Sequence, residues 1–576
     1  MSERSVLISI AFGLLVASLA AVPARAVRQQ PASPPADLVL INGKVVTVEE
    51  SLPEAQAVAI VGDRIAGIGS SEEIKRHAGP KTQVIDLQGQ LVIPGFVEGH
   101  GHFTGVGQAQ LNLNLMTTSS WDEIVSMVAE AVKTAKPGQW IYGRGWHQEK
   151  WSRTPEPNVE GFPTHHALSK VSPGNPVLLT HASGHASFAN AKAMELSGVT
   201  GKTPNPSGGD FLKDSSGNPT GLFRETASRL IRSRAGEPPL TPAEQAARAR
   251  RILELASQEV LSKGVTSFQD AGSTTADVDL MKQMIDEGKI NVRLWVMLRM
   301  HNEALASSLA KYRMIDYGNG FLTVRGIKKS IDGALGSRGA WLMEPYSDKP
   351  GDTGHNTTTI EEIREASKLA IEHGYQMCVH AIGDRANRET LNIFEDVYKA
   401  NPDKKDLRWR VEHAQHLHPS DIPRFGTLGV IASMQGVHCT SDAPYVPARL
   451  GDKRAEGGAY VWQKLMKSGA VVTNGTDAPV EDVSPIGSFY STVSRRTKDG
   501  TVFYADQRMS RLEALKSYTI NGAYAAFEED SRGSLKKGKY ADLVVLSKDI
   551  MTVPEEEIPS TDVAYTIVGG KIRYRK

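Results

Sequence analysis

The chain has 576 residues, 40% hydrophobic and 23% charged, so it is long enough for two or three compact units of ordinary globular composition. Its 66 basic and 65 acidic residues nearly cancel, and no long basic stretch stands out. No nucleic acid is therefore expected as a partner, because that binding needs concentrated positive charge. The two cysteines, Cys378 and Cys439, are too few for a disulfide scaffold.

The N-terminus has the features of an export signal. A basic residue precedes an apolar stretch from Val6 to about Val22, and Ala24-Arg25-Ala26 offers a small-residue cleavage site. We therefore predict a signal peptide over residues 1–26 and a disordered leader over residues 27–35. The protein would then be periplasmic or secreted and would meet the membrane only transiently. A retained membrane anchor is the alternative.

Short strand patterns occur at both ends of the rest of the chain. Asn42-Gly43, a pair typical of hairpin turns, separates the first two of them. A second set of short strands, between residues 541 and 574, closes the chain. Each set is too small to bury a core alone, so residues 36–94 and 533–576 are predicted to form one small β-sandwich.

Eight short apolar runs follow one another between residues 95 and 532, and helical patterns separate several of them. Helix starts are marked by the capping box Thr241-Pro242-Ala243-Glu244, by Thr359 and by Ser510. This alternation predicts an α/β fold, a TIM-like (β/α)8 barrel with its chemistry at the C-terminal strand ends. A doubly wound open sheet is the alternative, but no Gly-rich phosphate loop supports it. The predicted strands are residues 95–102, 265–270, 292–298, 324–332, 376–380, 409–413, 430–433 and 471–476.

The gap from about residue 103 to residue 240 is too long for a connection between a strand and its helix. Residues 121–135 have a helical pattern, and residues 176–180 have a strand pattern. We expect this segment to be a large insertion after the first strand that lies over the barrel mouth, where substrate specificity usually resides.

Histidines and one aspartate stand at the ends of several predicted strands. His100 and His102 are two residues apart on the first strand, so both imidazoles point the same way and can reach one metal ion. His380, His413 and Asp477 end later strands. A lone pair of this kind is more often an ordinary histidine pair, but ligands collected from several strand ends predict a metal site.

The phrases around these residues resemble those of the amidohydrolase superfamily, most closely its amidohydrolase-3 branch of YtcJ-like and N-substituted-formamide-deformylase-like enzymes. They are V-I-P-G-F at residues 92–96 and on to His102, H-A-I-G-D at residues 380–384, Glu412-His413, and Asp477. The resemblance runs from about residue 36 to the C-terminus. It implies the same barrel and sandwich. It also implies a buried ion on His100, His102 and Asp477, with a second, more exposed ion on His380 and His413.

A lysine is a further candidate ligand. Alternation puts Lys328 on the strand face opposite Ile327 and Ile331, and hence toward the barrel interior. The resemblance implies a carboxylated lysine that bridges two metals at the end of the fourth strand, and Lys328 matches that position. A lysine in an ordinary salt bridge is the alternative, and a register error of one residue would exchange Lys328 for Lys329.

Asp477 is the predicted catalytic residue. A carboxylate that touches both metal and water can accept a proton during attack and deliver it to the leaving nitrogen. Alone, the segment Thr476-Asp477-Ala478-Pro479 is typical of a turn. The four histidines on strand ends favour the catalytic interpretation.

Four further residues are candidates for contact with the substrate. Trp146 lies in an aromatic segment that either walls a pocket or simply packs. His185 belongs to a Gly-His phrase of the amidohydrolase-3 branch, and a core or capping histidine is the alternative. Arg338 and Asp384 fall in motif positions, where side chains that merely hold loops would look the same in sequence.

These features predict a metal-dependent hydrolase of non-peptide C–N bonds in small molecules, such as N-acyl, N-formyl or cyclic amides. One or two divalent ions are expected; Zn²⁺ suits imidazole and carboxylate ligands, and Fe²⁺, Mn²⁺ and Co²⁺ are alternatives. An ester or lactone hydrolase is one rival. The other is a non-catalytic binding protein on a hydrolase barrel, although such relatives typically lose metal ligands. A homo-oligomer is compatible with the sequence.

The mature protein is expected to begin at Val27, because the A-x-A motif that directs cleavage ends at Ala26. Mass spectrometry of the N-terminal peptide, after expression in an exporting bacterial host, tests this expectation. A chain that begins at Met1 and sediments with membranes would instead support the retained anchor.

Overall fold

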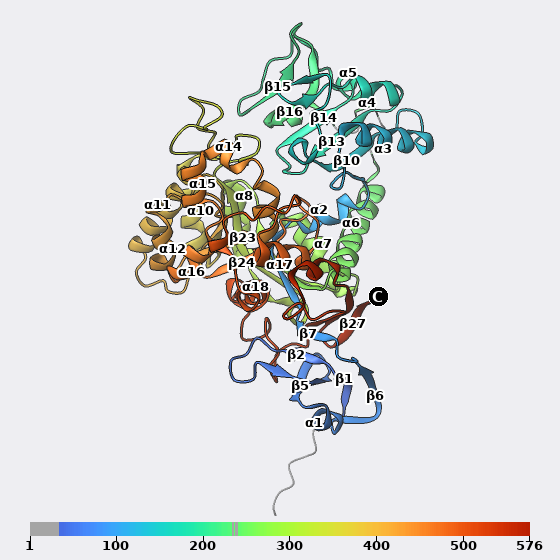
Figure 1. Ribbon diagram of the computed structural model, residues 1–576, viewed down its shortest axis with the longest axis vertical. Coiled ribbons are helices and arrows are strands. Elements are labelled where there is room, and N and C mark those ends of the chain that lie inside the picture. The colour runs from blue at the N-terminus through green and yellow to red at the C-terminus, as the bar shows by residue number, and fades with distance from the viewer. Residues whose placement is uncertain (1–33, 233–234, 237–239) are drawn as a thin grey trace, which may run out of the picture.

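The computed structural model describes residues 34–232, 235–236 and 240–576. In Figure 1 a small β-sandwich lies at the bottom, the barrel at the centre and the insertion at the top. The predicted signal peptide and most of the predicted leader fall outside the described residues and stay predictions. None of the helices in the described part of the chain has the length and apolar character needed to span a bilayer.

Eight parallel strands form the barrel, and each pairs with the next one along the chain. All eight predicted strands are present, so the (β/α)8 prediction is confirmed. They are β8 (Phe96–Gly101), β17 (Val265–Ser273), β18 (Arg293–Leu298), β20 (Leu322–Ser330), β21 (Gln376–Ala381), β22 (Arg410–His413), β23 (Ile431–Gln435) and β24 (Val472–Gly475). The short β19 (Met314–Asp316) pairs antiparallel with β20.

The barrel closes where its first and last strands, β8 and β24, meet. Just beyond β24, the Asp477 N–H donates to the carbonyl of His100 at 2.8 Å. Just beyond β8, the His102 N–H donates to the carbonyl of Ala478 at 2.7 Å. These two bonds fix the backbone of three predicted ligands on one seam.

Glycines allow the two strands to approach along this seam. A Cβ on Gly99 would lie 2.5 Å from the carbonyl oxygen of Asn474. A Cβ on Gly475 would lie 2.5 Å from the Glu98 carboxylate. Any larger residue at either position would push the first and last strands apart.

Helices surround the barrel, and the three predicted helix starts are confirmed. Thr241 and Ser510 form capping boxes, and Thr359 caps its helix by accepting the Glu362 N–H. These residues precede α6 (Pro242–Ser262), α18 (Arg511–Ser517) and α10 (Ile360–His373). The other helices between β8 and the C-terminal strands, outside the insertion, are α2 (Phe103–Ala109), α7 (Thr275–Asp286), α8 (Asn302–Tyr312), α9 (Tyr317–Gly320), α11 (Asp384–Ala400), α12 (Ile422–Leu428), α13 (Gly436–Asp442), α14 (Val446–Leu450), α15 (Asp452–Gly458), α16 (Trp462–Lys467), α17 (Pro485–Ser494) and α19 (Ile520–Ala525).

Both chain ends build the small sandwich. C-terminal β25 pairs antiparallel with N-terminal β7, and one hydrophobic core draws on both ends, which confirms the predicted sandwich. One sheet contains β5 (Arg64–Gly69), β4 (Ala57–Val61), β1 (Ala36–Ile41) and β6 (Ala78–Asp86), flanked by α1 (Ser71–Lys75). The other contains β27 (Lys571–Arg575), β26 (Val563–Val568), β25 (Leu543–Leu546), β7 (Leu91–Pro94), β2 (Lys44–Val46) and β3 (Glu54–Ala55). The domain boundaries drawn from the sequence stay predictions.

The hairpin predicted at Asn42-Gly43 is wrong. The strand before it, β1, pairs with β4 and β6, whereas the strand after it, β2, pairs with β3 and β7 in the other sheet. Asn42 has a φ of +57°, so a tight turn is present. The turn carries the chain from one sheet to the other, because both flanking strands bury apolar side chains in the core between the sheets.

The insertion forms a compact unit around a six-stranded sheet. The predicted helix and strand correspond to α3 (Trp121–Thr134) and β13 (Val177–His181). The rest of the sheet comprises β15 (Gly209–Lys213), β16 (Pro219–Glu225), β14 (Ala186–Ala189), β10 (Ile141–Trp146) and β9 (Leu113–Asn114), with α4 (His166–Val171) and α5 (Ala191–Ser197) beside it. Figure 1 shows this unit above the barrel, on the side away from the sandwich.

A buried ion pair ties the barrel to the C-terminal strands. Arg293, at the start of β18, donates from Nε and Nη2 to the Asp542 carboxylate at 2.6 and 3.1 Å. The two side chains are 1% and 4% exposed. The guanidinium also lies over the rings of Phe321 and Tyr540, 4.7 and 3.9 Å from their centroids. Loss of either charge would leave the other buried without its partner.

Asp542→Ala is therefore expected to lower the free energy of unfolding by about 3–5 kcal/mol, measured by urea denaturation. The matched control is Asp396→Ala, because Asp396 pairs with Arg364 at the surface, where the side chains are 56% and 38% exposed. That control is expected to lose less than about 1 kcal/mol. If both variants lose the same free energy of unfolding, the buried Arg293–Asp542 pair contributes no more to stability than a surface pair.

Candidate metal centre

The five residues predicted as histidine and aspartate ligands gather at the C-terminal end of the barrel. His100 lies on β8, His102 directly after it, His380 on β21, His413 at the end of β22 and Asp477 directly after β24. The ring centroids of His100 and His413 are 4.7 Å apart, and those of His380 and His413 are 4.5 Å apart. The structure thus brings all five side chains into one cluster.

Asp477 lies between the histidines of the cluster. Its Oδ1 is 3.2 Å from His102 Nε2 and 3.6 Å from His100 Nε2. Its Oδ2 is 4.0 Å from His413 Nδ1. Asp477 and His413 have φ angles of +57° and +77°, in the left-handed region that residues other than glycine seldom adopt. Such strain concentrates at functional sites, where the surrounding structure has to hold it.

Unpartnered polar atoms show that this cluster fits a divalent cation. Asp477 Oδ1, His380 Nε2 and His438 Nε2 are buried without a hydrogen-bond partner among the described residues. Buried polar atoms are rarely left in this state. In the described part of the chain, His100, His102 and Asp477 form one group with ligand atoms close enough to share an ion. His413, His438 and Asp477 form a second such group.

A buried charge network orients His100. The carboxylate of Glu412, on β22, bonds to His100 Nδ1, so Nε2 is the nitrogen that faces Asp477. Arg410 pairs with Glu412, with 2.7 Å between Nε and Oε1. Burial, reinforced by the charge of Lys328, lowers the pKa of His100 to about 4. A neutral imidazole held through its second nitrogen by a carboxylate is the usual state of a metal-binding histidine.

Lys328 faces the same interior, whereas Lys329 does not. The Lys328 side chain is buried on β20, and its Nζ lies 3.2 Å from His100 Nε2. Burial lowers the pKa of Lys328 to about 8. Lys329 Nζ instead donates to the carbonyl of Met300 at 3.0 Å. The structure therefore places in the cluster the lysine that strand alternation favoured.

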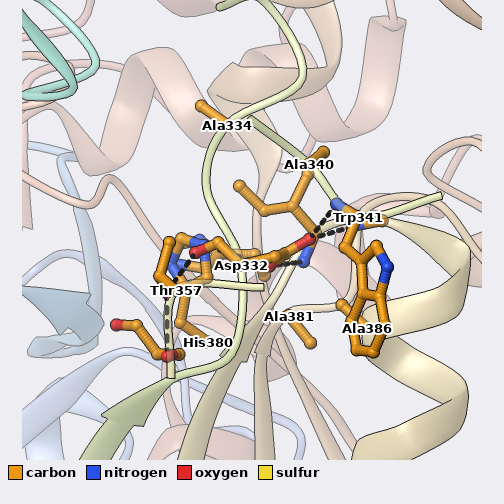
Figure 2. Close-up of polar contacts among 12 residues, drawn as sticks. Asp332, Ala334, Ala340, Trp341, Thr357, His380, Ala381 and Ala386 are labelled. Atoms are coloured by element: carbon orange, nitrogen blue, oxygen red, sulfur yellow. Dashed lines mark hydrogen bonds and ion pairs between the residues drawn. The ribbon is translucent and has the colours of Figure 1, made fainter. Parts of the chain in front are cut away.

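Asp332, two residues beyond β20, holds the loops beside His380. Figure 2 shows its carboxylate next to the His380 ring and bonded to backbone N–H groups. The donors are Trp341, Ile382 and Gly383, at 2.9, 3.0 and 2.8 Å. Burial raises the pKa of Asp332 to about 7. These three bonds fix the chain on both sides of the site, immediately after the strand that carries His380.

The cluster opens into a cavity of about 870 Å³ at the barrel mouth. His102, Lys328, His380, His413 and Asp477 all lie on its wall. The insertion supplies another part of the wall, through residues 183–185, 225, 226, 228 and 229. A small molecule in this cavity would therefore touch both the barrel and the insertion.

A model of the amidohydrolase family (Amidohydro_3) matches residues 83–574, which is most of the chain. The chain belongs to the amidohydrolase family. Three relatives are similar to this amidohydrolase over nearly its whole length. Protein LONG AFTER FAR-RED 3 of Arabidopsis thaliana is 34% identical and aligns with 94% of this chain and 92% of its own. Putative amidohydrolase YtcJ of Bacillus subtilis is 30% identical, over 93% and 99%. N-substituted formamide deformylase of Arthrobacter pascens is 28% identical, over 94% and 98%.

Solved structures agree with this assignment. An uncharacterized metal-dependent hydrolase from Pyrococcus horikoshii OT3 superposes with a TM-score of 0.71 at 27% sequence identity. The match covers 90% of this chain and 99% of that one. The predicted amidohydrolase-3 branch and the barrel of a metal-dependent hydrolase are thereby confirmed.

Among the predicted substrate residues of this amidohydrolase, His185 reaches the cavity and Trp146 does not. His185 lies on the cavity wall, with its ring 6.2 Å from that of His380 and its Nδ1 2.8 Å from Glu225 Oε2. Trp146 is fully buried in the core of the insertion, where its indole N–H donates to the Leu179 carbonyl at 3.0 Å. It packs against the rings of Trp151, His181 and Phe188 instead of lining the cavity.

Arg338 and Asp384 hold loops and do not line the cavity. Arg338 binds the Asp348 carboxylate through Nε and Nη2, at 3.3 and 3.0 Å. Asp384, at the start of α11, accepts the N–H groups of Met343 and Arg385, both at 2.9 Å. These contacts match the loop-holding alternative for both residues.

The sequence did not reveal two groups that the fold brings to the site. His438 lies three residues beyond β23 on α13, so its position after a barrel strand was the one available signal. Arg144 comes from β10 in the insertion, and no spacing in the sequence connects it with the barrel. The position of Arg144 at the cavity depends on how the insertion packs on the barrel.

The purified amidohydrolase is expected to hold divalent transition metal, and His102→Ala and His413→Ala are each expected to lower the metal content severely. A site with few ligands depends on every one of them. Plasma mass spectrometry of the metal bound per chain measures this. His373→Ala, in the last turn of α10, is the control. It is expected to keep the metal content of the unaltered protein. Undiminished metal in both site variants would remove the cluster as the metal centre.

The same measurement separates the two lysines. If Lys328 bridges two ions, Lys328→Ala lowers the number of ions per chain, whereas Lys329→Ala leaves it unchanged. The reverse result would mean that Lys329 is the ligand and that the strand register is off by one residue.

Proposed function

We propose that this amidohydrolase cleaves non-peptide C–N bonds in small molecules, such as N-acyl, N-formyl or cyclic amides. The position of Asp477 carries the proposal, because its carboxylate lies between the histidines and keeps one buried oxygen without a hydrogen bond. The name of one relative, N-substituted formamide deformylase, supports the same bond class.

We propose that His100, His102 and Asp477 hold one divalent ion, with His413, His438 and His380 available for a second. These nitrogen and oxygen donors suit Zn²⁺, and Fe²⁺, Mn²⁺ and Co²⁺ accept the same donors. A divalent ion bound here supplies Lewis-acid polarisation and makes water acidic near neutral pH.

Asp477 is the group that moves the proton in this proposal. Burial alone would raise its pKa, but the surrounding imidazoles of His102, His100 and His413 hold it well below the usual range. The carboxylate is therefore ionised near neutral pH and can accept a proton as water attacks the carbonyl carbon. It then passes that proton to the nitrogen as the C–N bond breaks, and the products are a carboxylic acid and an amine.

We also propose that Lys328 is carboxylated. Its lowered pKa leaves part of the amine neutral near neutral pH, and a neutral amine can add to carbon dioxide with loss of one proton. The resulting carbamate would place an anionic oxygen donor beside His100 and the rest of the cluster. A charged amine that only contacts His100 is the alternative.

We further propose that the protein acts outside the cytoplasm, in the periplasm or as a secreted enzyme. The apolar stretch and the cleavage motif of residues 1–26 support this location.

An ester or lactone hydrolase would use the same site, because both reactions need one polarised carbonyl. A panel of matched amides and esters, assayed with and without a chelator, separates the two. Chelator-sensitive turnover of esters alone would favour the ester hydrolase. No turnover of either, in protein shown to contain metal, would favour a binding protein.

Asp477→Asn is expected to keep the fold and to lower kcat by about 10²–10⁴-fold, or roughly 3–5 kcal/mol in the barrier, because it removes the proton acceptor. The assay uses an amide that the unaltered protein hydrolyses. Asp396→Asn, a surface aspartate on α11, is the control and should retain full activity.

Metal content has to be measured in the same samples. Loss of kcat with the metal still bound supports proton transfer by Asp477, whereas joint loss supports a ligand role alone. Full activity of Asp477→Asn would remove this residue from the mechanism.

A further inference from the structure

Two arginines reach the cavity without a carboxylate partner. Arg144, half-buried on β10, donates from Nε to the Pro479 carbonyl at 3.1 Å and from Nη2 to the Ala182 carbonyl at 3.3 Å. Arg299, directly after β18, has only a long hydrogen bond from Nη2 to Ser330 Oγ at 3.4 Å. Both line the same cavity as the metal centre. Neither makes an ion pair with any of the described residues.

Buried arginines elsewhere in the described part of the chain have partners within the protein. Arg293, Arg410 and Arg449 each pair with a carboxylate. Arg495 has no such pair, but it donates to two backbone carbonyls and lies over the rings of Trp462 and Phe503, away from the cavity. Arg144 and Arg299 differ because their free donors face a space that a ligand can enter.

The carboxylate charge near the two arginines is small, which leaves room for a negatively charged ligand. Burial lowers the pKa of both guanidiniums, and Asp477 supplies the one carboxylate charge that opposes this effect. In the proposed function Asp477 binds metal, so its negative charge is already matched there. The cavity would then hold two arginines that no described carboxylate pairs with, and a carboxylate on the ligand would supply that partner.

A glycine makes room for the Arg299 side chain. Gly272, with a φ of +151°, lies so close to Arg299 that a Cβ there would be 2.8 Å from Arg299 Cδ. The backbone at Gly272 thus leaves space for the Arg299 side chain at the cavity.

We propose that the substrate amide carries a carboxylate and that Arg144 and Arg299 bind it while the amide lies at the metal centre. Arginine suits this task because its planar donors match the two oxygens of a carboxylate. One arginine comes from the insertion and the other from the barrel, so a bound carboxylate would also join the two parts. This inference rests on the proposed C–N hydrolysis.

Two matched pairs of compounds test the proposal. The first pair is N-formylphenylalanine, as both enantiomers, and its uncharged primary amide, which place the charge on the amine side. The second pair is N-benzylsuccinamate and the corresponding uncharged diamide, which place it on the acyl side. In at least one pair, kcat/KM of the unaltered protein is expected to be higher for the charged member by about 10–100-fold.

Arg299→Met is expected to remove that preference, chiefly through KM, and to change kcat/KM for the uncharged member by no more than about twofold. Arg144→Met is expected to act in the same direction. Since Arg144 also holds the Pro479 carbonyl near Asp477, Arg144→Lys is added, and it should recover part of the preference. Arg364→Met, which removes a surface charge on α10, is the control and should keep the preference intact.

Activity and ligand-binding measurements together distinguish failure of the carboxylate site from failure of the proposed hydrolysis. If uncharged amides are hydrolysed as well as charged ones, and Arg299→Met has no selective effect, the proposed function stands and the carboxylate site is overturned. If no amide is hydrolysed, calorimetric titration with N-benzylsuccinamate and N-formylphenylalanine decides. Binding that Arg299→Met abolishes would support the arginine site without the hydrolysis, and binding that is absent or unaffected would overturn it.

Discussion

The candidate site depends on the seam between the first and last barrel strands. The backbone bond from Asp477 to His100 holds the aspartate within 4 Å of two histidines that lie far away in the sequence. The positive φ of Asp477 is tolerated because this bond and the neighbouring strand fix the backbone. The other ligands only have to project from strands that the barrel already places around this point.

Below the seam, a buried charge network sets the chemistry of the ligands. Arg410 stabilises the ionised form of Glu412, and Glu412 in turn fixes which nitrogen of His100 faces the cavity. These groups come from strands on different parts of the barrel, so the network also constrains the spacing of β8 and β22. Above the seam, the insertion adds His185, Glu225 and Arg144, which give the cavity its polar wall. The barrel thus supplies the candidate metal ligands, and the insertion supplies part of the cavity wall.

The sequence predicted those features that follow from regular spacing of residue types along the chain. Strand periodicity and capping residues located the eight barrel strands and the starts of α6, α10 and α18. Alternation along β20 distinguished Lys328 from Lys329. Tertiary contacts that no local pattern encodes were missed. The Asn42-Gly43 turn gave no information on pairing partners, and Trp146 looked the same in sequence whether it faced the core or the cavity. His438 and Arg144 reach the site only through the placement of α13 and the docking of the insertion.

The glycine contacts along the seam have a consequence for how the site comes into being. Three donors of the candidate centre, His100, His102 and Asp477, lie on or just beyond the first and last strands of the barrel, which approach each other closely at Gly99 and Gly475. A chain made from its N-terminus therefore has no complete ligand set until its last barrel strand is available. Capture of an ion would then mark the completion of the barrel, and a partly folded chain would offer the ion only isolated histidines.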